Sequence, residues 1–195
     1  MPENYAAELA LVITDLDRIG FGVRDLAQLR RYGKYRAAMP VLLKWFATVS
    51  SEEMKEDLVR TLSVPWAGPE VASAFVQGFK TSDNFLLKWA IGNGLSIVAD
   101  DSVAEEIFEL VRDRRHGRAR EMLAIALSRM KNPRVREIAR SLLKDDEVQG
   151  HAVIALRKLR AVEAIQDISE LSNHPKSWIR AEVKKTLAAF KNTSA

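Results

Sequence analysis

Apolar residues are spaced along this chain as on one side of a helix, and the arrangement itself repeats. A segment with apolar residues eight and four positions before a leucine, and a small residue directly before it, ends at Leu62, Leu95, Leu127, Leu156 and Leu187. The intervals between these leucines are 33, 32, 29 and 31 residues. Offsets of eight, four, one and zero share one side of an α-helix. A near-constant interval of this size predicts a stack of similar helical units.

A second helix is predicted before each of these segments. An apolar residue lies 14 to 17 positions upstream of each leucine, at Phe46, Phe79, Leu110, Leu142 and Leu171. Further apolar residues stand three and seven positions before it, which is again helical spacing. Each unit is therefore predicted to be a pair of amphipathic helices, A then B, joined by a short turn. One pair cannot bury its apolar faces alone, so the pairs must stack.

The repeat columns divide the chain into a cap, an array and a tail. Residues 1–33 do not fit the columns, and we expect two helices there, over 4–19 and 23–32, which cap the first repeat. Residues 34–191 are predicted to hold five repeats, at 34–64, 65–98, 99–130, 131–159 and 160–191. Residues 192–195 are predicted to be a frayed tail.

The B-helix pattern reads apolar–basic–x–x–apolar–x–x–small–Leu, and is clearest in AREMLAIAL (119–127) and VQGHAVIAL (148–156), with PRVREIARSLL as the preceding A helix. This pattern resembles short HEAT-like repeats of the PBS-lyase type. The resemblance covers about residues 35–191 and implies an all-α protein, a right-handed α–α superhelix of about five helix pairs. The signatures of tetratricopeptide and ankyrin repeats, which have similar periods, are absent.

Composition narrows the class of protein. A hydrophobic fraction of 47% is enough for a core. The absence of cysteine excludes disulfides and thiolate metal sites and is compatible with the cytoplasm, where we expect the protein. No apolar run approaches the roughly 20 residues that span a bilayer, so we expect no membrane partner. A formal charge of +4 is weak evidence for nucleic acid.

No residue pattern indicates a reaction. The Asp100–Asp101 and Asp145–Asp146 pairs each precede a predicted helix, where aspartate caps free N–H groups. The three histidines lack the spacing of metal ligands. Nucleophile and phosphate-loop motifs are missing. We therefore expect no enzyme activity, no cofactor and no metal site.

A mostly basic column lies seven positions before the anchor leucines, at Lys55, Lys88, Arg120, Gln149 and Arg180. These cations could form a stripe that binds phosphates. Alternatively, each side chain packs along the seam between repeats and pairs with an acid or carbonyl of the next repeat, as HEAT-like families generally use this position. The second interpretation is favoured.

The opposite side of the B helices is predicted to face outward and to bind a partner. Two tryptophans and three aliphatic residues are an unusual share of large apolar groups for such a surface. The outward positions hold Leu86, Trp89, Asn93, Arg118, Glu121, Ile125, Ile154, Trp178 and Lys185. Tryptophan, aliphatic residues and arginine together are typical of protein-binding hot spots. The alternatives are that curvature of the stack buries some of them, or that the register is shifted by one residue.

The leading functional hypothesis is a non-catalytic module that binds a protein or peptide on the B-helix face. The family resemblance suggests a scaffold or a toxin-neutralising immunity protein. The alternative is nucleic-acid binding. HEAT-like DNA glycosylases use Trp and Arg on this face, as at Trp89, Trp178 and Arg118, but also an aspartate, which none of the outward positions supplies. HEAT-like bilin lyases are a third class, for which no residue set is found. The sequence leaves the partner, the oligomeric state and the curvature open.

Overall fold

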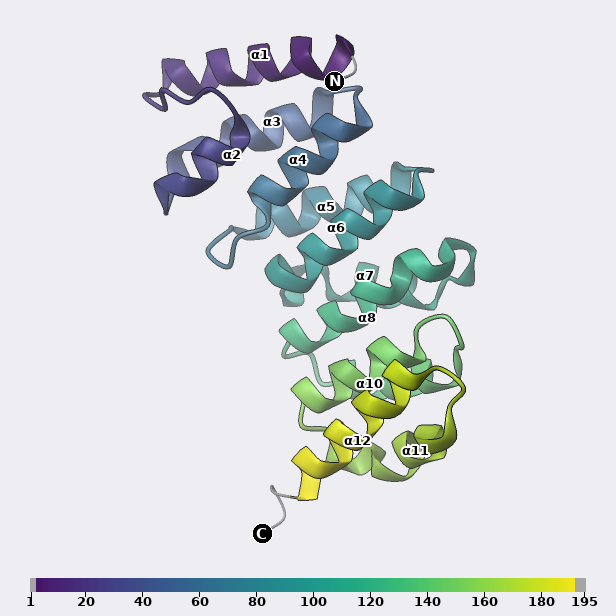
Figure 1. Cartoon of the computed structure of the whole chain (residues 1–195). Helices are drawn as coiled ribbons and strands as arrows, with labels where there is room; N and C mark the ends of the chain where they lie inside the picture. The colour runs from purple at the N-terminus through teal and green to yellow at the C-terminus, as the bar shows by residue number, and fades with distance from the viewer. Residues whose placement is uncertain (1–2, 192–195) are drawn as a thin grey trace. The chain divides into compact units, whose positions relative to one another are not determined.

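The computed structural model describes residues 3–191, which form twelve α-helices linked by short turns and by eight 3-10 helices (Figure 1). The α-helices are α1 (Glu3–Arg18), α2 (Leu26–Leu29), α3 (Met39–Thr48), α4 (Glu52–Leu62), α5 (Pro69–Thr81), α6 (Phe85–Val98), α7 (Ala104–Arg112), α8 (Glu121–Ala126), α9 (Val135–Ser141), α10 (Gln149–Lys158), α11 (Ile165–Glu170) and α12 (Ser177–Lys191). The 3-10 helices are η1 (Arg30–Tyr32), η2 (Arg36–Ala38), η3 (Asp101–Val103), η4 (Arg114–Arg120), η5 (Leu127–Arg129), η6 (Leu142–Lys144), η7 (Val162–Ala164) and η8 (Leu171–Asn173). These residues contain no β-strand, which confirms the all-α prediction. The predicted tail at 192–195 lies outside the described residues, as do residues 1–2 of the predicted cap.

The chain consists of two compact units, residues 1–98 (unit 1) and 99–195 (unit 2). The boundary falls between the second and third predicted repeats. In unit 1, α3 packs on α4, α5 packs on α6, and contacts between α3 and α5 and between α4 and α6 join the two pairs. Helix α1 contacts both α3 and α4, and α2 contacts α4. The second N-terminal helix is shorter than predicted, because α2 covers only four residues before the chain tightens into η1.

Unit 2 is built from shorter helices. Helix α8 packs on α10, and α10 packs on α12. The B helix predicted over residues 119–127 is interrupted, because α8 covers only 121–126 and is flanked by η4 and η5. The 3-10 segment η4 contains a break at Gly117, whose φ of 52° lies in the left-handed region that glycine tolerates.

The periodic columns form the core of both units. The anchors Leu62, Leu95, Leu127 and Leu156 have no exposed surface, whereas Leu187 on α12 is partly exposed. The small residues before the anchors are all buried, and Gly94 shows why the column is small. A Cβ atom on Gly94 would lie 2.5 Å from the ring of Phe75 and 2.6 Å from Oγ of Ser63. The prediction that these columns point inward is confirmed.

Side-chain caps define several helix starts. Oγ of Ser51 accepts the N–H of Met54 at 3.2 Å at the start of α4, and Oδ1 of Asn84 accepts the N–H of Leu87 at 3.1 Å in α6. Asp100 accepts the N–H of Ser102 at 2.9 Å, as expected for a capping aspartate. Its neighbour Asp101 instead accepts the N–H groups of Lys131 and Asn132, at 2.8 and 2.9 Å, and so fixes the turn before the next helix.

Candidate functional site

The outward side of α6 carries an uncharged apolar surface, here called the α6 face, made of Phe85, Leu86, Trp89 and Asn93. Leu86 is 64% exposed, Phe85 49% and Trp89 41%, and Asn93 is also exposed. The spacing places them on one side of the helix, opposite the buried Leu87, Ile91 and Leu95. The one charged residue of α6, Lys88, lies away from this side, with Nζ 5.7 Å from the ring centre of Phe79. Large exposed apolar groups close together on one face are typical of an interaction site.

The three B helices of unit 2 present a second outward surface, here called the unit 2 face. Its members lie nine, five and two positions before the anchor leucines or two after them, at Arg118, Met122, Ile125, Arg129, Glu147, His151, Ile154, Lys158, Trp178, Glu182 and Lys185. Trp178 is 43% exposed and the side chain of Arg118 66% exposed. Ile125 and Ile154 are only partly exposed, so a partner could contact only part of each side chain.

The prediction that Glu121 points outward is wrong. Glu121 is 8% exposed, and its Oε1 accepts a hydrogen bond from Nε of Arg118 at 2.8 Å. Gly150 stands at the same offset in α10, six before the anchor leucine, and it also faces the B helix that follows. A Cβ atom on Gly150 would lie 2.2 Å from the ring of Trp178, which belongs to the following helix. Glu121 is therefore covered by α10, which packs against α8.

Trp178 and His151 contact each other on the unit 2 face. The indole lies over Gly150, and its ring centre is 5.3 Å from that of His151. Nδ1 of His151 is buried and has no hydrogen-bond partner among residues 3–191. Burial lowers the pKa of His151, the carboxylate of Glu121 opposes that shift, and the cations Arg118 and Lys176 add to it. The ring is therefore held neutral below the pH at which a free histidine would take a proton.

The basic column behaves differently at each position. Arg120 is fully buried: Nη1 donates to Oδ2 of Asp145 at 2.8 Å and to the carbonyl oxygen of Val111 at 3.0 Å, and Nη2 donates to Glu147 at 2.7 Å. Asp145 and Glu147 belong to the next predicted repeat. Burial raises the pKa of Asp145. The hydrogen bonds from Arg120 and from the N–H of Glu147, together with the charges of Arg120 and Arg114, outweigh burial, so the pKa lies below its usual value.

The other cations of the column have more local partners. Arg180 donates to the carbonyl oxygens of His174 and Pro175, at 2.7 and 2.9 Å, which lie in the turn of its own repeat, the last one predicted. Lys88 rests over the Phe79 ring of its own helix pair. Lys55 lies at the wall of a pocket. The residues of the column thus have different roles: Arg120 pairs with acids of the next repeat, Arg180 binds carbonyl oxygens of a turn, and Lys55 lines a pocket.

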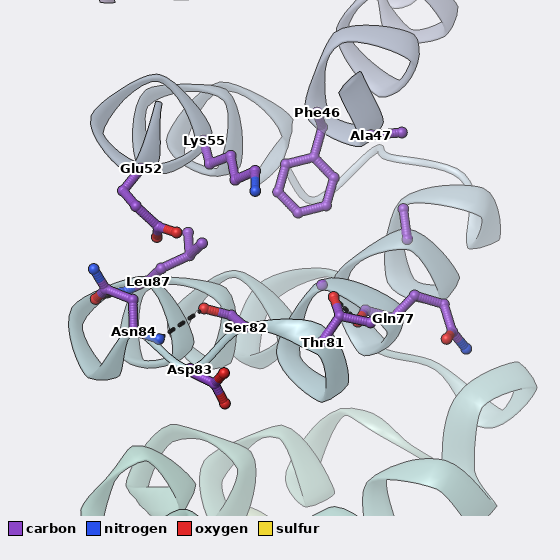
Figure 2. A pocket seen from close by; sticks show the side chains of 12 residues that line it. Phe46, Ala47, Glu52, Lys55, Gln77, Thr81, Ser82, Asp83, Asn84 and Leu87 are labelled. Atoms are coloured by element: carbon purple, nitrogen blue, oxygen red, sulfur yellow. Dashed lines mark hydrogen bonds between the residues drawn. The ribbon is translucent and has the colours of Figure 1, made fainter. Parts of the chain in front are cut away.

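That pocket, of about 560 Å³, opens in unit 1 where α3 and α5 end and α4 and α6 begin (Figure 2). Phe46 and Leu87 supply apolar wall, and Glu52, Lys55 and Asn84 supply polar groups. Oε2 of Glu52 is buried without a hydrogen-bond partner in the part of the chain that is described. No pattern in the sequence predicts this pocket, because its walls come from the turns of two helix pairs.

Comparison with family models, with curated proteins and with solved structures gave no match. A function for this chain must therefore be argued from its own residues and their contacts. Among the described residues, no group of three or more histidine and acidic side chains could hold a metal ion. Within the same range, every helix is too short or too polar to span a bilayer.

Sequence reasoning missed several members of the unit 2 face, notably Met122, Arg129, His151 and Lys158. The signal was present, because each stands at an offset that shares a side of the helix with Ile125, Ile154 or Trp178. Met122 and His151 stand five positions before an anchor leucine, and Arg129 and Lys158 stand two positions after one.

Proposed function

We propose that this chain is a non-catalytic protein-interaction module of HEAT-like helix pairs, stacked as a right-handed superhelix, which binds a partner protein on the outward side of its B helices. The buried columns and the contacts between successive B helices within each unit support the stacking. A small cytoplasmic scaffold or a toxin-neutralising immunity protein is the role that agrees with the family resemblance and with the cysteine-free composition.

The α6 face is the observation that carries this proposal. Phe85 and Trp89 alone expose on the order of 200 Å² of apolar side chain, using about 200 Å² for each whole side chain. Burial of that area against a partner would contribute about 5 kcal/mol before the entropic cost of association. No charge on the face opposes an apolar partner surface.

Nucleic-acid binding is the second candidate, and one observation favours it. Three cations of the unit 2 face are exposed and make no ion pair within residues 3–191, namely Arg129, Lys158 and Lys185. The face exposes one tryptophan, Trp178, and its other large apolar residues, Ile125 and Ile154, are aliphatic. This composition argues against nucleic acid, since single strands are held by stacking on several aromatic rings. Protein binding is therefore preferred.

The test is affinity capture from the native host with the wild type and with Leu86→Asp/Trp89→Asp. We expect the double variant to keep the wild-type circular dichroism and to lose the captured partner. Leu11→Asp is the matched control, because Leu11 is 54% exposed in the same unit but lies on α1. Capture that survives the double substitution, or is lost equally with Leu11→Asp, contradicts the assignment.

A further inference from the structure

The net charge of the chain is unevenly distributed. Residues 1–98 carry 11 lysines and arginines against 11 acidic residues, and residues 99–195 carry 19 against 15. The entire formal charge of +4 therefore belongs to unit 2. A partner of unit 2 approaches a positive surface, which favours a negatively charged one.

Two acidic residues belong to the unit 2 face, Glu147 and Glu182, and Glu121 is buried beside it; all three are already paired with arginines of the same unit. Glu121 pairs with Arg118, with Oε1 and Nε 2.8 Å apart. Glu147 accepts from the buried Arg120 at 2.7 Å. Glu182 accepts from Nη1 of Arg157 at 2.5 Å. None of the three carboxylates is left to attract a basic partner.

The remaining cations of the face lie together toward the C-terminal parts of its helices. Arg129 belongs to η5, which follows α8; Lys158 ends α10; and Lys185 lies in the second half of α12. All three are exposed, and no acidic side chain in the described part of unit 2 pairs with them. The successive contacts of α8, α10 and α12 place them along one edge of the face.

Apolar groups occupy the region next to these cations. Ile125 and Ile154 stand at equivalent positions on α8 and α10, and both are partly exposed. Trp178 is held against Gly150 and His151, so its ring presents a fixed surface. An unpaired buried Nδ1 on His151 adds a polar group within this region. A ligand that fits must therefore combine apolar side chains with negative charge at one end.

We propose that the unit 2 face binds an acidic, apolar-anchored segment of a partner protein. This inference rests on the proposed function and adds the chemistry of the partner. Apolar side chains of the segment lie over Ile125, Ile154 and Trp178, and its carboxylates face Arg129, Lys158 and Lys185. The aliphatic residues make a protein segment a better complement than a nucleic acid.

The test is selection of peptides from a random 12-residue display library on the immobilised full chain, followed by affinity measurement with the enriched peptides. We expect the enriched peptides to combine acidic residues with aromatic or aliphatic ones. Lys158→Glu/Lys185→Glu should weaken their binding at least tenfold at ~50 mM salt, and by much less at ~500 mM, where surface charges are screened. Lys131→Glu/Lys144→Glu is the matched control, because it changes the same charge at exposed positions outside the face and should bind like the wild type.

Several outcomes would overturn this inference. They are a failure to enrich any peptide, enrichment of neutral or basic peptides, or equal weakening by both charge-reversed variants. If Ile154→Asp abolishes binding while Lys158→Glu/Lys185→Glu does not, the face is a docking site without a preference for acids, and only the proposed function stands. Binding of a 20-nucleotide single-stranded DNA that Lys158→Glu/Lys185→Glu abolishes would assign the face to nucleic acid instead.

Discussion

Replacing Arg120 with methionine removes a buried guanidinium that joins three segments of unit 2. Its nitrogens donate to the carbonyl oxygens of Val111, at the end of α7, and Gly117, in η4, and to the carboxylates of Asp145 and Glu147, before α10. The side chain of Arg120 has no exposed surface, and that of Asp145 is 10% exposed. Methionine matches the length of the aliphatic part but leaves these acceptors without their donor.

The expected loss of stability follows from those contacts. Removing one member of a buried ion pair leaves an uncompensated charge and costs about 3–5 kcal/mol. Arg114, whose Nε lies 3.5 Å from Oδ2 of Asp145, can move closer and recover part of that loss. We therefore expect Arg120→Met to lower the free energy of unfolding by about 3 kcal/mol. Asp145→Asn in the Arg120→Met background should recover more than ~1 kcal/mol, since it removes the unpaired charge.

Urea unfolding followed by circular dichroism measures both effects, with Arg134→Met as the control. Arg134 donates to both carboxylate oxygens of Glu105, at 2.6 and 2.8 Å, but the two side chains are 48% and 62% exposed. An exposed pair of this kind contributes less than ~1 kcal/mol. If Arg120→Met costs no more than Arg134→Met, the reasoning that burial makes this column structural is refuted.

Three further predictions follow from single positions. Gly94→Ala should destabilise unit 1 by about 1–3 kcal/mol, because a new Cβ would meet Phe75 and Ser63, although alanine is the better helix former. Arg160→Gly should raise the free energy of unfolding by about 0.5–1 kcal/mol, because Arg160 has a φ of 51°. His151→Gln should flatten the pH dependence of stability. Burial lowers the pKa of His151 in the folded chain, so the unfolded chain binds a proton at this residue more readily. The wild type should therefore lose stability relative to the variant as the pH falls below about 6.5.

Each of these predictions has a clear contrary result. Urea midpoints at pH 7.5 decide the first two: a stabilising Gly94→Ala would mean that the two helices can separate without loss, and a destabilising Arg160→Gly would mean that the arginine side chain contributes more than its backbone strain costs. For the third, the same titration is repeated at pH 5.5. Parallel curves for the wild type and His151→Gln would show that His151 takes up its proton as easily in the folded state.

The sequence predicted what depends on local spacing. Helical periodicity placed the buried columns, because residues such as Leu95 and Leu123 lie on the same side of a helix wherever that helix packs. It failed at Glu121, whose burial depends on how closely α10 approaches α8, a distance that no spacing within α8 encodes. The pocket beside Glu52 was missed for the same reason, since it exists only where two helix pairs meet.

Gly150 has a consequence for how the unit 2 face can vary. Any side chain larger than hydrogen at this position would displace the indole of Trp178, because a Cβ atom would lie 2.2 Å from its ring. The glycine lies in the first turn of α10, where replacing it does little harm to the helix itself. The same Cβ atom would lie 2.9 Å from Cγ1 of the buried Ile179, so larger residues would also force α12 away from α10. A saturation scan selected for folding should therefore return only small residues at this codon, and one selected for docking should return almost exclusively glycine.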